Sequence, residues 1–184
     1  MPRGTKSEPE LNHLAAKIRP TDPQVLQRKA LRLATWPDEA FRDGQTAIGI
    51  AKQAIELAEA NSNASASLRQ MITLGAAHAA AGDFDQGAAV VQEVYEMMYP
   101  QGPKTRIDEY FGRYAKLFKS KQILIWRNHA LVGRIFLDAK GETAFQAKLI
   151  SLDGDTTTLQ KLDGKTIEIS LSELSVADRE HIKQ

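Results

Sequence analysis

Histidine is the side chain best suited to acid–base catalysis near neutral pH, and it is a common metal ligand. The chain has four histidines, His13, His78, His129 and His181, and they lie in different parts of the sequence. None of them shows the i, i+4 spacing with a carboxylate partner that a His-Glu-x-x-His metal site requires. We therefore expect no metal site, and we interpret His78 as a packed helix residue.

Other residue patterns that support catalysis are also missing from the sequence. Cysteine is absent, which excludes thiol catalysis, disulfides and cysteine-based zinc sites. No Gly-x-Ser-x-Gly nucleophile elbow occurs. Ala81-Gly82-Asp83 lacks the Gly-Lys-Ser/Thr of a phosphate-binding loop, so we interpret it as a turn between helices. These absences predict a protein that is not an enzyme and uses no cofactor.

A basic stretch over 104–127 has the charge to bind nucleic acid or another anionic ligand. Its aromatic residues recur at helical spacing, so we favour a helix that buries the aromatics and leaves the basic face in water. The net charge of +1 gives no general attraction to nucleic acid. Weak binding of nucleic acid or an anionic ligand through helix 104–121 stays open as the alternative function. The residues concerned are Lys104, Arg106, Arg113, Lys116, Lys119, Lys121 and Arg127, with Tyr110, Phe111, Tyr114, Phe118 and Trp126 between them and only Asp108 and Glu109 opposing.

The elements that would position these residues begin with helices. Residues 1–20 are polar and contain prolines, which predicts a flexible tail. Apolar residues then recur at helical spacing in five segments, each bounded by capping or breaking residues. Asp22 or Thr21 is the expected cap of the first helix, and Asp83 that of the fourth. The expected helices cover 22–35, 45–60, 64–81, 84–98 and 104–120.

Beyond residue 121 the sequence changes to short β-prone runs separated by turn residues. Asp153-Gly154 and Asp163-Gly164 favour tight hairpins, because a type I′ turn needs positive φ. Ser175, with Asp178 three residues on, predicts the cap of a last helix over 175–182. Short strands in a segment of this size favour a closed barrel, since closure leaves no exposed edge. The expected strands cover 133–137, 144–151, 156–162 and 165–171, after a connector at 122–131.

The segment from Leu74 to Gly87 reads Leu-Gly-x-x-His-x-x-x-Gly-Asp-Phe-x-x-Gly, and Pro100 closes the unit. This pattern resembles a tetratricopeptide repeat, with His78 in place of the usual aromatic residue and Gly87 in place of the usual alanine. A less regular unit precedes it, so the resemblance covers about residues 24–101, and helix 104–120 resembles the cap that such arrays need. Small residues at Gly75 and Gly87 would let two helices pack closely.

The resemblance implies a concave groove lined by one face of the third helix. This face carries one arginine and otherwise small or apolar residues, so we do not expect it to hold a peptide's C-terminal carboxylate. An apolar helix or a neighbouring domain would suit it better. The expected groove residues are Arg69, Ile72, Thr73, Ala76 and Ala79.

The β half contains Arg134-x-Phe136-x-Asp138-x-x-Gly141, then Ala147, then Leu159-x-x-x-Asp163-Gly164-Lys165, and finally Leu171-x-x-Leu174-Ser175-x-x-Asp178. This pattern resembles the first-type SLA homology domain of a yeast endocytic adaptor, with Phe136 in place of the usual tryptophan. The resemblance implies an SH3-like barrel, which in that adaptor recognises Asn-Pro-Phe peptides. Lys148, Lys161 and Lys165 are expected to share a side of the barrel, where they either bind a peptide or protect an edge strand from aggregation. We favour protection.

The sequence therefore predicts an α + β chain of two domains. An antiparallel helical-hairpin array of tetratricopeptide type covers 21–121, and a small SH3-like barrel covers 132–184. The expected function is that of a non-catalytic scaffold or adaptor that binds a protein or peptide partner, while nucleic acid is not the expected partner. No apolar run reaches the ~20 residues of a membrane span, and the N-terminus has no apolar signal core, so we expect a cytoplasmic protein if the chain is complete.

Overall fold

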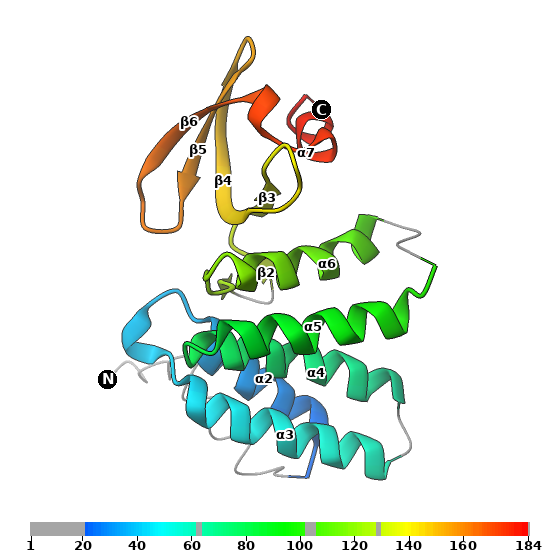
Figure 1. Ribbon diagram of the computed structural model, residues 1–184. Helices are drawn as coiled ribbons and strands as arrows, with labels where there is room; N and C mark the ends of the chain where they lie inside the picture. Colours follow the sequence, from blue (N-terminus) through cyan, green and yellow to red (C-terminus); the bar gives the residue numbers. More distant parts are fainter. Residues whose placement is uncertain (1–20, 62–63, 102–105, 128–129, 184) are drawn as a thin grey trace, which may run out of the picture.

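A computed structural model describes residues 21–61, 64–101, 106–127 and 130–183 of the chain, and at 64–68, 106–110, 127 and 130–131 it describes the backbone alone. Five packed helices form one part of the molecule, and a four-stranded antiparallel sheet with a short helix forms the other (Figure 1). The predicted tail at 1–20 lies outside the described residues, as do His13, Lys104 and His129.

The helical part follows the predicted elements closely. Its helices are α2 (Pro23–Thr35), α3 (Gly44–Ala60), α4 (Ala64–Ala80), α5 (Phe84–Met98) and α6 (Arg106–Lys119), with a 3-10 turn at Glu39–Phe41. Aspartates begin three of them, because the side chains of Asp22, Asp43 and Asp83 accept hydrogen bonds from backbone N–H groups of the first turn. The expected helices and the caps at Asp22 and Asp83 are therefore confirmed.

The helices α4 and α5 approach each other at two glycines. A Cβ added to Gly75 would lie 2.5 Å from Val91 Cγ2 and 2.9 Å from the carbonyl oxygen of Gly87. A Cβ on Gly87 would lie 2.7 Å from the carbonyl oxygen of Gly75. Real side chains do not approach this closely, so the glycines set the spacing of the pair, which confirms the close packing expected from the sequence.

The sheet follows a connector that contains a small two-stranded ladder, β1 (Trp126–Arg127) and β2 (Ala130–Leu131). The turns predicted at Asp153-Gly154 and Asp163-Gly164 are present, with positive φ at Gly154 and Gly164, and Gly141 also has positive φ. Ser175 caps the last helix, as expected. The remaining elements are β3 (Arg134–Leu137), β4 (Ala144–Asp153), β5 (Thr156–Lys161), β6 (Thr166–Ser170), a 3-10 turn at Leu171–Glu173, and α7 (Val176–Ile182).

The expected closure into a barrel is wrong. The strands pair in the order β3-β4-β5-β6, and no ladder joins β6 to β3 among the described residues. The free edge of β3 is occupied instead by the chain that leads into α7. Ser175 N–H donates to the Leu137 carbonyl oxygen at 3.0 Å, and Asp138 forms an isolated bridge with Leu174. The edge that a closing strand would need is therefore already in use.

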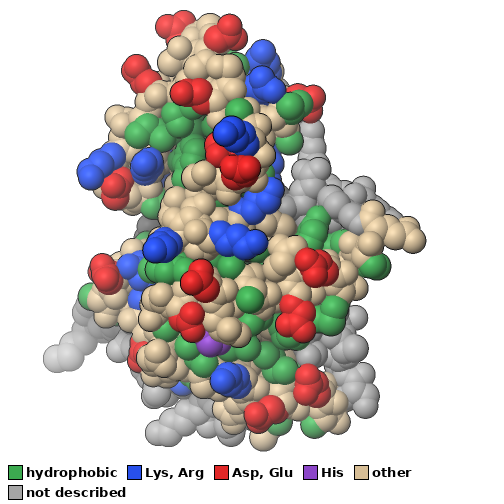
Figure 2. Space-filling view, viewed as in Figure 1, with side chains coloured by type: hydrophobic (Ala, Val, Ile, Leu, Met, Phe, Trp, Pro, Cys, Tyr) green, Lys and Arg blue, Asp and Glu red, His purple; other side chains and the backbone are tan. Residues whose placement is uncertain are grey.

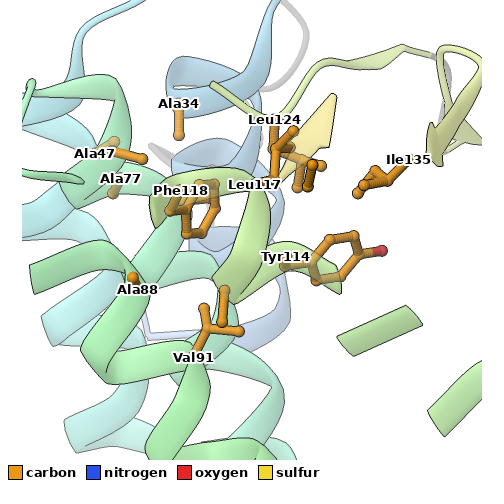
Figure 3. Close-up of a cluster of buried hydrophobic side chains, with 14 of the residues drawn as sticks. Ala34, Ala47, Ala77, Ala88, Val91, Tyr114, Leu117, Phe118, Leu124 and Ile135 are labelled. Atoms are coloured by element: carbon orange, nitrogen blue, oxygen red, sulfur yellow. The ribbon is translucent and has the colours of Figure 1, made fainter. Parts of the chain in front are cut away.

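Alternate residues of β3 supply two hydrophobic cores, because successive side chains of a strand point to opposite faces. Ile135 and Leu137 belong to a large cluster that continues into the helical part through Phe118 and Leu124 (Figure 3). Phe136 belongs to a second cluster, which α7 helps to cover. The second cluster contains Phe136, Ala147, Leu159, Leu171, Leu174 and Ile182. The sheet thus packs on α6 and the connector with one face and on α7 with the other.

Candidate binding groove and the junction beside it

A cavity of about 360 Å³ opens between α2, α4, α6 and the connector. Its volume lies within the range of about 300–1,000 Å³ typical of ligand pockets. Most of its lining is apolar, and the connector closes one side of it with Leu124 and Trp126. We call this cavity the groove. It is lined by Gln27, Leu31, Arg69, Ile72, Thr73, Ala76, Phe111, Tyr114, Leu124 and Trp126.

Four of the five groove residues expected from the sequence line this cavity. Arg69, Ile72, Thr73 and Ala76 share one face of α4, and Arg69 is exposed. Ala79 is the exception, because it is fully buried and lies against α5 where Gly87 passes. Helical spacing assigned Ala79 to the same face as the other four residues, but Ala79 faces α5 and not the cavity.

The polar groups of the groove are few. Gln27 Nε2 donates to Thr73 Oγ1 at 3.5 Å across the α2–α4 wall. The indole Nε1 of Trp126 is buried and has no hydrogen-bond partner among the described residues. Buried N–H groups are normally paired, so this donor is suited to an acceptor that enters the groove.

Helix α6 separates the groove from the sheet, and its aromatic residues pack into the core as expected. Tyr114 is 6% exposed and Phe118 is 1% exposed, so both belong to the core, and Phe111 packs against it. Figure 3 shows Phe118 directed toward the alanines of the other helices. The prediction that the aromatic stripe is buried is confirmed for these three residues. The side chain of Tyr110 lies outside the described part.

The opposite side of α6 carries an ionic cluster that the sequence did not reveal. Arg113 Nη1 donates to both carboxylate oxygens of Asp178 at 2.9 Å and to the carbonyl oxygen of Ile135 at 2.7 Å. Arg134 Nε donates to Asp178 Oδ1 at 2.9 Å. The side chain of Arg113 is 5% exposed and that of Asp178 is fully buried. The cluster therefore ties the helical part, β3 and α7 together inside the protein.

The protonation of Asp178 is set by competing effects. Burial acts to raise its pKa, but the Leu137 N–H at 2.9 Å, the Ser175 hydroxyl at 2.7 Å and the Arg113 guanidinium outweigh burial. The pKa of Asp178 is therefore lowered, and its carboxylate is charged at neutral pH. A buried charge of this kind is tolerated because each oxygen accepts several hydrogen bonds.

The connector is fixed by a second buried polar residue, Gln146 of β4. Its Oε1 accepts from Ile125 N–H at 2.9 Å, and its Nε2 donates to the carbonyl oxygens of Ile125 and Val132, both at 2.9 Å. This arrangement substitutes for a strand pairing along the connector. Gln146 thereby holds Leu124 and Trp126 in position as the wall of the groove.

The three lysines expected on one side of a barrel are not grouped in that way. In the register of the sheet, Lys148 lies opposite Gln160 and Lys161 lies opposite Ala147, so the first two lysines project from opposite faces. Lys165 lies in the β5–β6 turn, where its carbonyl oxygen accepts from Lys161 N–H at 2.8 Å. All three side chains are exposed.

A different feature of the sheet was not anticipated. Large apolar side chains are exposed on the β4–β5 hairpin and near the following turn, and Figure 2 shows hydrophobic side chains on the surface of this part. Exposed apolar patches often mark contact surfaces. Its members are Leu149, Ile150, Leu152 and Leu162.

His78 of α4 has an acidic neighbour. His78 Nδ1 lies 3.6 Å from Asp83 Oδ2. Desolvation by burial lowers the pKa of His78 even though Asp83 acts to raise it, so the ring is neutral at neutral pH. No group of three or more histidine, aspartate or glutamate side chains within 21–61, 69–101, 111–126 and 132–183 could hold a metal ion. Within the same described stretches, no helix is long and apolar enough to cross a membrane.

Comparison of the chain with protein-family models, with curated proteins and with solved structures finds no match. The resemblances to tetratricopeptide repeats and to the SLA homology domain stay predictions that rest on the residues quoted for them. What the structure establishes is an array of antiparallel-packed helices followed by an open four-stranded antiparallel sheet.

Proposed function

We propose that the chain is a non-catalytic interaction protein that docks an apolar segment of a partner protein in the groove between α2, α4, α6 and the connector. The observation that carries the proposal is the lining of the groove, which combines an apolar wall with a buried donor, the indole of Trp126, that has no hydrogen-bond partner in the part of the chain that the structure describes. An apolar side chain would fill the cavity, and a nearby carbonyl oxygen of the same segment would accept from the indole.

We further propose that α2–α5 are two tetratricopeptide-type units with α6 as their cap, and that the β part is a member of the SLA homology group with an opened barrel. Supporting the first idea, Gly75 and Gly87 of the quoted motif lie where α4 and α5 pack too closely to admit a Cβ. Supporting the second, Arg134 and Asp178, which lie 44 positions apart at the two ends of the quoted motif, form an ion pair.

The alternative function, binding of nucleic acid through a basic α6, has less support. A nucleic-acid surface needs several exposed cations along one face. Arg113 is buried and paired with Asp178, and Lys116 is half-buried on the side that faces the sheet. Of the described basic side chains near this helix, Lys119 and Lys121 are exposed. These two side chains do not by themselves form a continuous basic face in the described part of the chain.

The groove proposal is tested by selecting peptides from a display library with the full chain and measuring their affinity for two matched variants. Ile72→Ala removes part of the groove wall, while Ile50→Ala removes the same atoms from another half-buried site on α3, outside the groove. We expect Ile72→Ala to weaken peptide binding about tenfold, the effect of losing one well-packed contact. Ile50→Ala should leave the affinity unchanged.

Two results would oppose the proposal. One is a selection that yields no binding peptide, and the other is a set of peptides that bind both variants as tightly as the original chain. Thermal melts of the variants establish that each is folded at the temperature of the assay.

A further inference from the structure

A second cavity, of about 370 Å³, lies on the other side of α6, between α5, α6 and the start of α7. Residues 112, 113 and 116 face this cavity, whereas residues 111 and 114 face the groove, so the two sites occupy opposite sides of one helix. We call it the junction cavity. Among its lining residues are Gln92, Tyr95, Arg113, Lys116, Leu137 and Ala177.

Arg113 lines the junction cavity, and not all hydrogen-bond donors of its guanidinium are used within the described part. Its three hydrogen bonds within the described part, one to Ile135 and two to Asp178, are all made by Nη1. Its Nε and Nη2 groups make no hydrogen bond to a described residue, and neither belongs to the fully buried side-chain atoms left without a partner, so water can reach them although the side chain as a whole is 95% buried. A buried guanidinium carries five N–H donors, and those left over favour an acceptor with negative charge.

Lys116 supplies a second cation one helical turn further along. Its side chain is half-buried in the cavity wall, with Nζ near Gly141, and it forms no ion pair with the described residues. The nearby carboxylate of Asp178 does not balance it, because Asp178 already accepts from Arg113, Arg134, Leu137 and Ser175. Figure 2 shows lysine and arginine side chains gathered where the sheet meets the helical part.

The remaining walls indicate what would carry the negative charge. Leu137 and Ala177 are apolar, while Gln92 and Tyr95 contribute an amide and a phenol from α5. The volume exceeds what a bare inorganic ion requires and falls in the range of small-molecule sites. Arg113 and Arg134 share the single carboxylate of Asp178, which leaves one net positive charge, and Lys116 adds a second, so the site matches a dianion better than a monoanion.

We propose that the junction cavity binds a small organic phosphate, with the phosphoryl group between Arg113 and Lys116 and the organic body against Leu137 and Ala177. This site is independent of partner docking in the groove. Because Arg113 also holds the sheet to the helices through Asp178, a bound phosphate would stabilise the junction between the two parts.

Calorimetric titration of the full chain with phenyl phosphate, inorganic phosphate and benzoate tests the proposal. Phenyl phosphate should bind more tightly than inorganic phosphate, which lacks the organic body, and more tightly than benzoate, which carries a single charge. Lys116→Gln should weaken phenyl phosphate binding about tenfold, the loss expected for one charge-assisted contact, and Lys116→Arg should retain it. Lys119→Gln is the matched control, since Lys119 lies on the same helix but is exposed and outside the cavity.

The proposal is overturned if the chain binds no phenyl phosphate, or if Lys116→Gln binds it as tightly as the original chain. Equal losses for Lys116→Gln and Lys119→Gln would also overturn it, because they would indicate general attraction to basic residues of α6. The groove variant Ile72→Ala should bind phenyl phosphate normally, so failure of one site is distinguishable from failure of the other.

Discussion

Asp178 is the residue on which the contact between the helical part and the sheet depends most. Its carboxylate joins a helix of the array, through Arg113, to the sheet, through Arg134 and the Leu137 N–H. Removing one member of a buried ion pair lowers the free energy of unfolding by more than the pair itself contributes to it. The reason is that the remaining charge stays buried without a counterion. The chain should therefore be unusually sensitive to substitution at this position.

Asp178→Asn should lower the free energy of unfolding by about 3–5 kcal/mol, since Arg113 is left as a buried charge without its counterion. Urea denaturation followed by circular dichroism measures the change. Asp153→Asn is the control, because Asp153 is an exposed aspartate at the end of β4. A loss as small as that of the control would contradict the role given to the cluster.

The same carboxylate predicts a dependence of stability on pH. Its pKa in the folded protein is lowered from an unfolded value of about 3.9, so the folded state binds the proton less readily than the unfolded state. The stabilisation is fully present above the unfolded pKa and is lost as the pH falls through the folded pKa. The difference in unfolding free energy between the original chain and Asp178→Asn should thus be constant near neutral pH and shrink below about pH 4. A difference that is unchanged in acid would show that Asp178 does not titrate in this way.

The sequence singles out some residues of this ionic cluster and not others. Arg134 and Asp178 both belong to the quoted β motif, whereas Arg113 lies outside it. An arginine on an amphipathic helix is ordinarily solvated, so the sequence predicts that its charge lies on the exposed face. Its burial depends on the sheet folding back over α6, which brings together residues 65 positions apart. Local periodicity cannot anticipate a contact of that kind.

Among the elements, the α4–α5 pair provides the sharpest test of helix packing. Gly75→Leu and Gly87→Leu should each lower stability by about 1–3 kcal/mol or more, because even a Cβ would meet Val91 or the opposite backbone. Gly49→Ala is the matched control, since a Cβ at Gly49 meets nothing within 4 Å. Alanine there should raise stability by about 0.5–1 kcal/mol through helix propensity. Thermal melts that leave Gly75→Leu and Gly87→Leu unchanged would count against the close packing.

The connector depends on Gln146 in a comparable way. Gln146→Ala leaves the N–H and carbonyl of Ile125 without their partners, at a cost of about 1–3 kcal/mol for each buried group. We expect faster amide hydrogen exchange at Ile125 and lower stability. Gln160→Ala removes one exposed hydrogen bond, to Gly164, and should change neither the amide exchange at Ile125 nor the stability. Unaltered exchange at Ile125 in Gln146→Ala would show that the connector is held by other contacts.

Helix and strand positions were predictable because local signals specify them. Aspartate caps begin the helices, and glycines with positive φ mark the hairpin turns. The topology of the sheet was not predictable in the same way. Whether the free edge of β3 pairs with β6 or with the chain around Ser175 is decided by tertiary packing, and Leu137 pairs with Ser175.

At the scale of the whole molecule, the helical part and the sheet share a hydrophobic cluster. Phe118 of α6, Leu124 of the connector and Ile135 of β3 all belong to it (Figure 3). Both proposed sites depend on this arrangement, because the connector closes the groove and the start of α7 closes the junction cavity. The groove was predictable only along α4. Its other walls come from α6 and from Trp126, which only the assembled chain brings together.

If a partner segment enters the groove, the indole of Trp126 reports on it most directly. The chain has two tryptophans, Trp36 and Trp126, so its nuclear magnetic resonance spectrum contains two indole N–H signals. Trp126 lines the groove, and Trp36 caps α2 outside it. Titration with a selected peptide should move the Trp126 signal strongly, together with the amides of Ile72 and Ala76, and leave the Trp36 signal in place. A bound peptide that leaves the Trp126 signal unmoved and instead shifts residues of the exposed β4–β5 patch would contradict the account.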